Sequence, residues 1–141
     1  MKAPIPAKTL KNIVDHYGIK KLSYFSNYDS WGMCYYTEGL IEINYFLKNK
    51  KKKFLNTLFH EIGHLYCYRN DIWKNYHIDK VRLSKKEKEL IVKTGLKAER
   101  WIENWAEKEM KKWFPKVSYD KGYYKPYKTK LFKEYLEENF K

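Results

Sequence analysis

The chain has 141 residues, 43% of them hydrophobic, which is enough apolar material for one core and leaves little room for a second domain. No stretch reaches the roughly 18 uninterrupted apolar residues of a membrane helix, so we exclude a membrane-spanning function. The formal net charge of +13 favours a polyanionic partner such as nucleic acid. Nearly all of the basic residues are lysines, however, and lysine lacks the planar guanidinium group with which arginine selects phosphate. Nucleic acid is therefore an alternative partner that we do not favour.

Periodic apolar residues in the first third of the chain predict one helix followed by short strands. They recur from Leu10 to Tyr17 at the spacing of one helical face, and Gly18 ends the pattern. In chain order, the expected elements are an amphipathic helix over residues 9–17, a strand over 22–25, a turn over 27–30, and strands over 31–36 and 40–44. The last two strands are joined around residues 37–39, so we expect an α+β fold with a short antiparallel sheet packed on a helix.

The rest of the chain is predicted to be helical, with a basic C-terminal extension. Five lysines between residues 48 and 53 indicate a solvated loop or a helix start, and Ser84 to Glu87 has the pattern of a capping box. The expected elements are a largely apolar helix over 54–68, an irregular connection over 70–82, helices over 84–94 and 96–114, and a Lys/Tyr-rich extension over 116–141, loop-like at first and with a short helix over 131–140. No linker interrupts the chain, so residues 1–141 are expected to form a single domain.

The chemical signal lies inside the predicted apolar helix, where His60-Glu61-Ile62-Gly63-His64 has the pattern H-E-x-x-H. Residues i and i+4 share a helical face, so both imidazoles can reach one ion, and neutral imidazole suits zinc at about 2.0–2.1 Å. Glu61 follows the first histidine, where its carboxylate can take a proton from zinc-bound water. We therefore expect one Zn²⁺ per chain, held by His60 and His64, with Glu61 as general base. The alternative is a pair of surface histidines.

A third protein ligand has to come from elsewhere in the sequence. A metzincin would have glycine three residues after His64 and histidine three residues further on, but those positions hold Cys67 and Asn70. Cys67 shares a helical face with His60, but residues i and i+7 are about 10 Å apart along a helix. Cys67 is therefore expected to be a core thiol rather than a ligand.

Two glutamates of a later helix, Glu99 and Glu103, are the remaining ligand candidates. On a helical wheel Glu99 falls between Ala106 and Met110, near the apolar face, and Glu103 lies further out. A carboxylate in an apolar face needs a partner, and a zinc ion is a suitable one. We expect Glu99 to be the third ligand, with Glu103 as the alternative. If Glu99 is the ligand, Glu103 is expected to orient a ligand histidine through its other ring nitrogen. For both, the competing interpretation is an exposed glutamate paired with lysine.

The succession of a helix, a short sheet, the segment from Thr57 to His64, and a later helix with Glu99 resembles the gluzincin arm of the zincins. The small size of the chain is similar to that of the minimal ImmA/IrrE-like and SprT-like zinc metallopeptidases, including phage-encoded ones. The resembling motifs cover roughly residues 31–113. The resemblance implies a minimal zincin-like fold and a zinc endopeptidase. Glu103 departs from the pattern, because thermolysin-like members have aspartate there.

The resemblance also implies where a peptide substrate binds. In such enzymes the substrate lies in extended form against an edge strand near the zinc. Main-chain hydrogen bonds to such a strand would hold a peptide of any sequence. The strand expected to serve here consists of Gly39, Leu40, Ile41, Glu42, Ile43 and Asn44. The alternative is that the strands only cover the helix. A hydrogen-bond donor for the oxyanion is also needed besides the metal. The side chains considered for that role are Tyr76, His77, Tyr123 and Tyr124.

The expected function is therefore a zinc-dependent protease that acts on a protein or peptide. Two alternatives are a DNA-associated SprT-like protease and a non-catalytic zincin-fold module that binds nucleic acid or a partner protein, although a pure binding module has no need of Glu61. Cys34 and Cys67 are the only cysteines and do not form a disulfide framework. The N-terminus has no apolar signal region, so we expect a cytoplasmic protein, or one of the host cytoplasm if it is phage-encoded.

Overall fold

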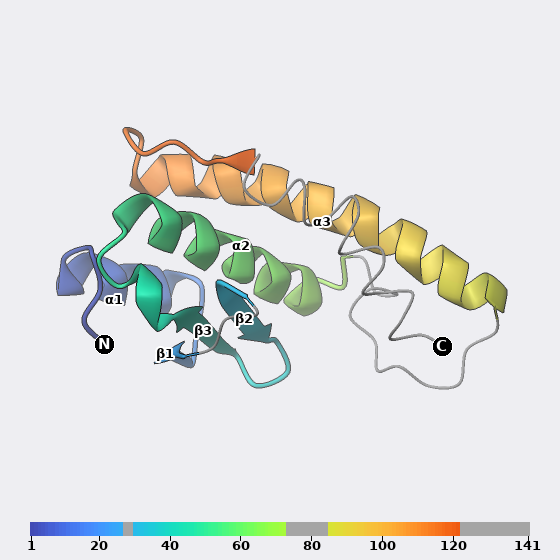
Figure 1. Ribbon diagram of the computed structural model, residues 1–141, viewed down its shortest axis with the longest axis horizontal. Coiled ribbons are helices and arrows are strands. Elements are labelled where there is room, and N and C mark those ends of the chain that lie inside the picture. Colours follow the sequence, from blue (N-terminus) through green and yellow to red (C-terminus); the bar gives the residue numbers. More distant parts are fainter. Residues whose placement is uncertain (27–29, 73–84, 122–141) are drawn as a thin grey trace.

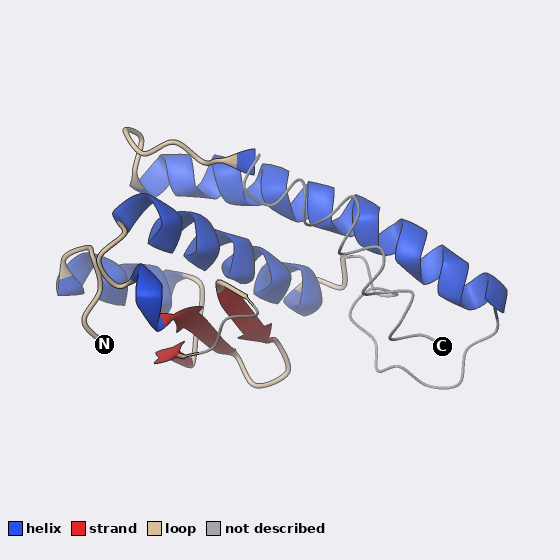
Figure 2. Cartoon of the chain, in the orientation of Figure 1, coloured by secondary structure: helices blue, strands red, loops and turns tan. Residues whose placement is uncertain are grey.

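The computed structural model describes the backbone of residues 1–26, 30–72 and 85–121, and their side chains except those of 85–96. The elements are, in chain order, helix α1 (Ala7–His16), strands β1 (Lys21–Phe25), β2 (Gly32–Tyr35) and β3 (Leu40–Asn44), the 3-10 helix η1 (Tyr45–Leu47), and helices α2 (Lys51–Arg69) and α3 (Lys85–Trp113). The α+β class expected from the sequence is confirmed, with helices and a small sheet in one chain (Figure 2).

Helix α2 lies between the sheet and α3 (Figure 1). Every residue from Phe54 to Gly63 is buried, because the sheet contacts one side of α2 and α3 contacts another. A helix enclosed in this way has no solvent-facing stripe in its middle. Its polar residues are therefore buried along with its apolar ones: His60 is 5% and Glu61 7% exposed.

The sheet is mixed, whereas the sequence led us to expect an antiparallel one. Strands β2 and β3 form the expected antiparallel hairpin, with Cys34 opposite Ile41. Strand β1 pairs in parallel with the other side of β3, so the strand order is β1-β3-β2. The expectation was wrong for β1 because the alternation of side chains sets which face of a strand is buried but not the direction of its neighbour.

Helix α3 is one continuous helix where the sequence predicted two. The expected break fell near Gly95, but a glycine inside a helix costs only about 1 kcal/mol relative to alanine. Ala98, Ile102 and Ala106, one turn apart, are fully buried in the contact with α2 and support the helix beyond that point. The helix ends at Trp113, in agreement with the predicted end before Pro115.

The chain turns back after α3 (Figure 1, orange to red). The backbone N–H of Val117 donates to the carbonyl of Phe114 at 3.1 Å, and the side chains of Val117 and Tyr119 pack against the core. We call residues 117–120 the return segment. It was predicted to belong to the basic C-terminal extension, but these residues contact the helices that carry the site.

Several expected elements lie outside the described residues. They are most of the turn over 27–30, most of the connection over 70–82, the loop around Gly122 and Pro126, and the helix over 131–140. Within the described part of the chain, no helix is both long enough and apolar enough to cross a membrane.

Candidate metal centre

Helix α2 places His60 and His64 one turn apart with their rings on the same side. Their Nε2 atoms are 3.3 Å apart, and the ring planes meet nearly edge to face at an angle of 75°. His60 is buried, and His64 is partly exposed. Two ring nitrogens therefore converge on one point beside the buried middle of the helix.

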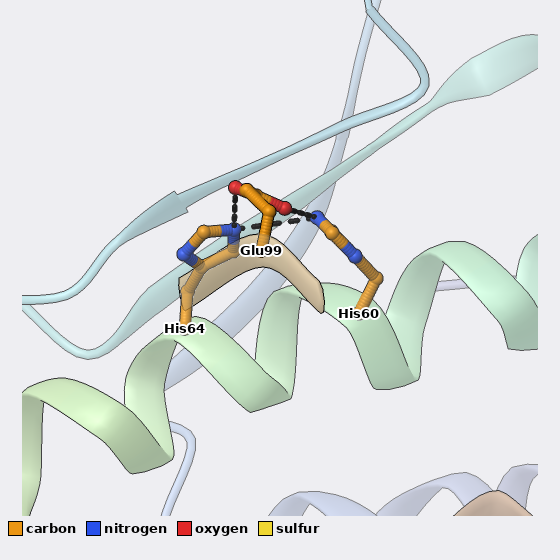
Figure 3. A group of neighbouring side chains, drawn as sticks. All are labelled: His60, His64 and Glu99. Atoms are coloured by element: carbon orange, nitrogen blue, oxygen red, sulfur yellow. Dashed lines mark hydrogen bonds and ion pairs between the residues drawn. The ribbon is translucent and has the colours of Figure 1, made fainter. Parts of the chain in front are cut away.

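Helix α3 brings a carboxylate to the same point. Glu99 is 3% exposed, and its Oε1 lies 3.1 Å from Nε2 of His64 while its Oε2 lies 3.5 Å from Nε2 of His60. Figure 3 shows the two imidazoles and this carboxylate pointing toward one another. Ligand atoms of all three residues lie within 4.8 Å of one another. Glu99 thus faces α2, which is the side that the helical wheel assigned to it.

The spacing of these atoms can be compared with the coordination shell of zinc. Bonds of about 2.0–2.1 Å in a tetrahedron place neighbouring ligand atoms about 3.3–3.4 Å apart. The two histidine nitrogens are 3.3 Å apart. Nε2 of His60 lies 3.5 Å from Oε2 of Glu99, and Nε2 of His64 lies 3.1 Å from the other oxygen, Oε1. The two nitrogens have the spacing of two corners of a zinc tetrahedron, and the carboxylate of Glu99, which approaches each nitrogen with a different oxygen, is placed to supply a third ligand.

Glu103 takes a different position, one turn further along α3. Its Oε1 lies 2.7 Å from Nδ1 of His60, the ring nitrogen that faces away from the convergence point. The same oxygen accepts a hydrogen bond from the hydroxyl of Tyr119 at 2.8 Å. Glu103 therefore contacts His60 from behind, and it is not among the residues whose ligand atoms converge.

The centre contains two buried carboxyl groups. Glu99 and Glu103, which both contact the histidines, are 3% and 5% exposed. Burying carboxylates is costly unless cations or hydrogen bonds compensate them, and a divalent cation is a strong compensating charge for such a cluster. The chemistry of the site thus agrees with its geometry in favouring a metal ion.

Glu61 lies on the side of α2 that faces the sheet. A Cβ atom added to Gly32 of β2 would lie 2.5 Å from Cγ2 of Thr57 and 3.1 Å from Cγ of Glu61, so only glycine lets the strand approach the helix this closely. Burial, and to a smaller extent the charge of Glu61, raise the pKa of the thiol of Cys34, the next inward-facing residue of β2. The side chain of Glu61 therefore lies at the contact between α2 and β2.

The expected substrate strand does not lie at an edge of the sheet. Strand β3, which contains Leu40, Ile41, Glu42, Ile43 and Asn44, is paired with β1 on one side and β2 on the other, and Gly39 precedes it. A strand bonded on both sides has no free row of main-chain groups for a peptide. The prediction was wrong because alternation shows that a strand exists but not its place in the sheet. In the described sheet, β1 and β2 are the edges.

Cys67 is a buried thiol, as the sequence indicated. Burial, and secondarily the charge of Glu99, raise its pKa to about 12, so the protonated form prevails near neutral pH. The side chains considered as oxyanion donors, Tyr76, His77, Tyr123 and Tyr124, lie outside the described residues.

The sequence did not point to Tyr119 or Asn56 as parts of this region. Tyr119 contacts Glu103, and Asn56 holds the residues on either side of Tyr119. Tyr119 is one of 14 tyrosines and lies in a segment that has the composition of a solvated extension. A useful signal would have been the position of Asn56, a polar residue four positions before His60 and so on the same face of the helix.

Comparison with known proteins finds no relative of this chain. No protein-family model matches the chain, and neither a curated protein nor a solved structure matches it. The residues of the site therefore have to indicate the function by their own chemistry.

Proposed function

We propose that the chain is a zinc-dependent peptidase that hydrolyses peptide bonds with Glu61 as general base. The observation that carries the proposal is the convergence of Nε2 of His60, Nε2 of His64 and the carboxylate of Glu99: the nitrogens are 3.3 Å apart, as in a tetrahedral zinc shell, and each lies within 3.5 Å of a carboxylate oxygen. These three residues would hold the ion, in an arrangement similar to that of the gluzincins. When bound, zinc would supply a Lewis acid that polarises a carbonyl and lowers the pKa of a water ligand.

The protein's own residues have distinct tasks in this proposal. Glu61 accepts a proton from the attacking water and returns it to the amine that leaves, so that its carboxylate is regenerated after each cycle. Its packing against Gly32 limits the positions that the carboxylate can take. Glu103 fixes the ring of His60 through Nδ1, which leaves Nε2 to face the ion.

The proposed substrate is a protein or peptide in extended form. We propose that it pairs with β2, an edge strand of the described sheet that borders Glu61 at Gly32. Met33 and Tyr35 of β2 are exposed on the outer face of the sheet. Because Cys34 and Cys67 are both free thiols, we place the activity in a reducing, cytoplasmic compartment.

The test is a comparison of cleaved peptides between wild-type protein and Glu61→Gln in a cell extract read by mass spectrometry. The amide cannot accept a proton, so cleavage should fall by about 10²–10⁴-fold while the fold and bound zinc are kept. Glu38→Gln, at an exposed site, is the control and should cleave like wild type. Equal cleavage by wild type and Glu61→Gln would refute the mechanism.

A further inference from the structure

We propose that Tyr119 is a positioning residue of the metal centre and that the return segment, residues 117–120, is an integral part of it. The inference rests on the proposed zinc site and concerns how that site is kept in shape. The hydroxyl of Tyr119 donates to Oε1 of Glu103 at 2.8 Å, and the same oxygen lies 2.7 Å from Nδ1 of His60. A chain of two hydrogen bonds therefore leads from the return segment to a candidate zinc ligand.

This chain of contacts constrains both the carboxylate and the ring. Glutamate has a flexible side chain, and the hydrogen bond from Tyr119 limits the rotation of its carboxylate next to His60. An ionised carboxylate only accepts hydrogen bonds, so the proton of the His60 ring is held on Nδ1. The lone pair then lies on Nε2, the atom that converges with Nε2 of His64.

Asn56 fixes the position of Tyr119 from both sides. Its Nδ2 donates to the carbonyl of Ser118 at 3.2 Å, and its Oδ1 accepts from the backbone N–H of Asp120 at 2.6 Å. Asn56 is 2% exposed and lies one turn before His60 on α2. The residues that flank Tyr119 are therefore attached to the same helix that carries the histidines.

A second attachment follows directly in the chain. Nζ of Lys121 donates to Oδ1 of Asn104 at 2.6 Å and lies 3.4 Å from Oε1 of Glu107, so the next residue is tied to α3. Tyr119 is thus held between α2, through Asn56, and α3, through Glu103. The contact of Tyr119 with Glu103 therefore depends on how α2 and α3 pack together. The contact of Glu99 with the two histidines depends on the same packing.

The test is Tyr119→Phe, which removes the hydroxyl and keeps the packing of the ring. Zinc affinity is measured by competition with a chelator, and the visible spectrum of the Co²⁺-loaded protein reports the geometry around the ion. Loss of a hydrogen-bond partner behind a metal ligand typically costs 10–100-fold in metal affinity, and because Tyr119 acts through Glu103 we expect about tenfold, with an altered Co²⁺ spectrum. The matched control is Tyr24→Phe, which removes a hydroxyl bonded to the carbonyl of Lys2.

Asn56→Ala provides a second route to the same contact. It should weaken zinc binding in the same direction, and the double variant with Tyr119→Phe should bind zinc about as Asn56→Ala does, because both changes break one chain of contacts. Unchanged zinc affinity and Co²⁺ spectrum in Tyr119→Phe, with normal zinc binding by wild type, would overturn the inference and leave the proposed function intact. Absence of zinc binding by wild type would instead overturn both.

Discussion

Oε1 of Glu99 lies 3.1 Å from Nε2 of His64, although the two residues belong to different helices. The candidate centre is therefore shared by α2 and α3 and depends on how closely they pack. Gly63, next to His64, lies at this contact: a Cβ atom there would be 2.7 Å from Cγ2 of Ile102. The local motif and the helix contact are thus parts of one arrangement.

Removal of either histidine should remove the metal. We expect purified wild-type protein to carry close to one zinc per chain, and His60→Ala or His64→Ala to carry almost none, because three protein ligands are the usual set of a catalytic zinc site. Elemental analysis after dialysis gives the stoichiometry. His16→Ala, at an exposed position on α1, is the control and should keep its zinc. Full zinc occupancy in the double variant of His60 and His64 would eliminate the site.

The two glutamates of α3 should differ in their effect on zinc. Glu99→Ala removes a candidate ligand and should abolish binding at micromolar zinc, whereas Glu103→Ala removes only the support behind His60 and should weaken binding by about 10–100-fold. Titration calorimetry or chelator competition on both variants measures the difference. The ligand assignment would be reversed if Glu103→Ala lost the metal and Glu99→Ala kept it.

Gly63→Ala tests the contact between the helices. Helix propensity alone predicts a gain of about 1 kcal/mol, because alanine is the better helix former. The added methyl would meet Ile102 at 2.7 Å, however, and overpacking of this kind costs about 1–3 kcal/mol. We expect a net loss of stability in denaturant unfolding and weaker zinc binding, since α3 must move with Glu99. A stabilised variant with wild-type zinc affinity would contradict this account.

Gly32→Ala tests the opposite side of α2. The added methyl would collide with Thr57 and Glu61, and neither histidine is among its nearest neighbours. We expect zinc to stay bound while the proposed peptidase activity falls by at least about tenfold, because Glu61, the proposed general base, is displaced. Measured together, Gly63→Ala and Gly32→Ala should separate metal binding from catalysis. If Gly32→Ala lost zinc and Gly63→Ala kept all of it, metal binding would depend on the sheet-facing side of α2 and not on its contact with α3.

The lysines at the start of α2 allow a test of nucleic-acid binding. Lys50, Lys51, Lys52 and Lys53 are exposed, and Nζ of Lys53 lies 5.7 Å from the ring of Trp31. We expect single-stranded DNA to bind weakly and to be released near physiological salt, as is usual for contacts with phosphate alone. Gel shifts at two salt concentrations measure this. Tight binding that persists in salt and is lost in Trp31→Ala would favour a DNA-associated protein, because stacking on an aromatic ring is less sensitive to salt.

The approach of His60 to His64 could be predicted from the sequence because the geometry of a single helix decides it. Residues four apart share a face in any α-helix, so the convergence of two imidazoles follows from spacing alone. The same local reasoning located α1, the hairpin of β2 and β3, and the end of α3 at Trp113. In each case the signal lies within a few residues of the feature that it predicts.

Tertiary structure alone decided the features that involve two distant segments. The wheel favoured Glu99 over Glu103, but only the packing of α3 on α2 brings Glu99 to the histidines and Glu103 to Nδ1 of His60. Likewise, alternation could not show that β3 is central, nor that Tyr119 folds back onto the site. The physical reason is that periodicity fixes the face of an element, whereas its register and neighbours depend on side-chain contacts across the whole core.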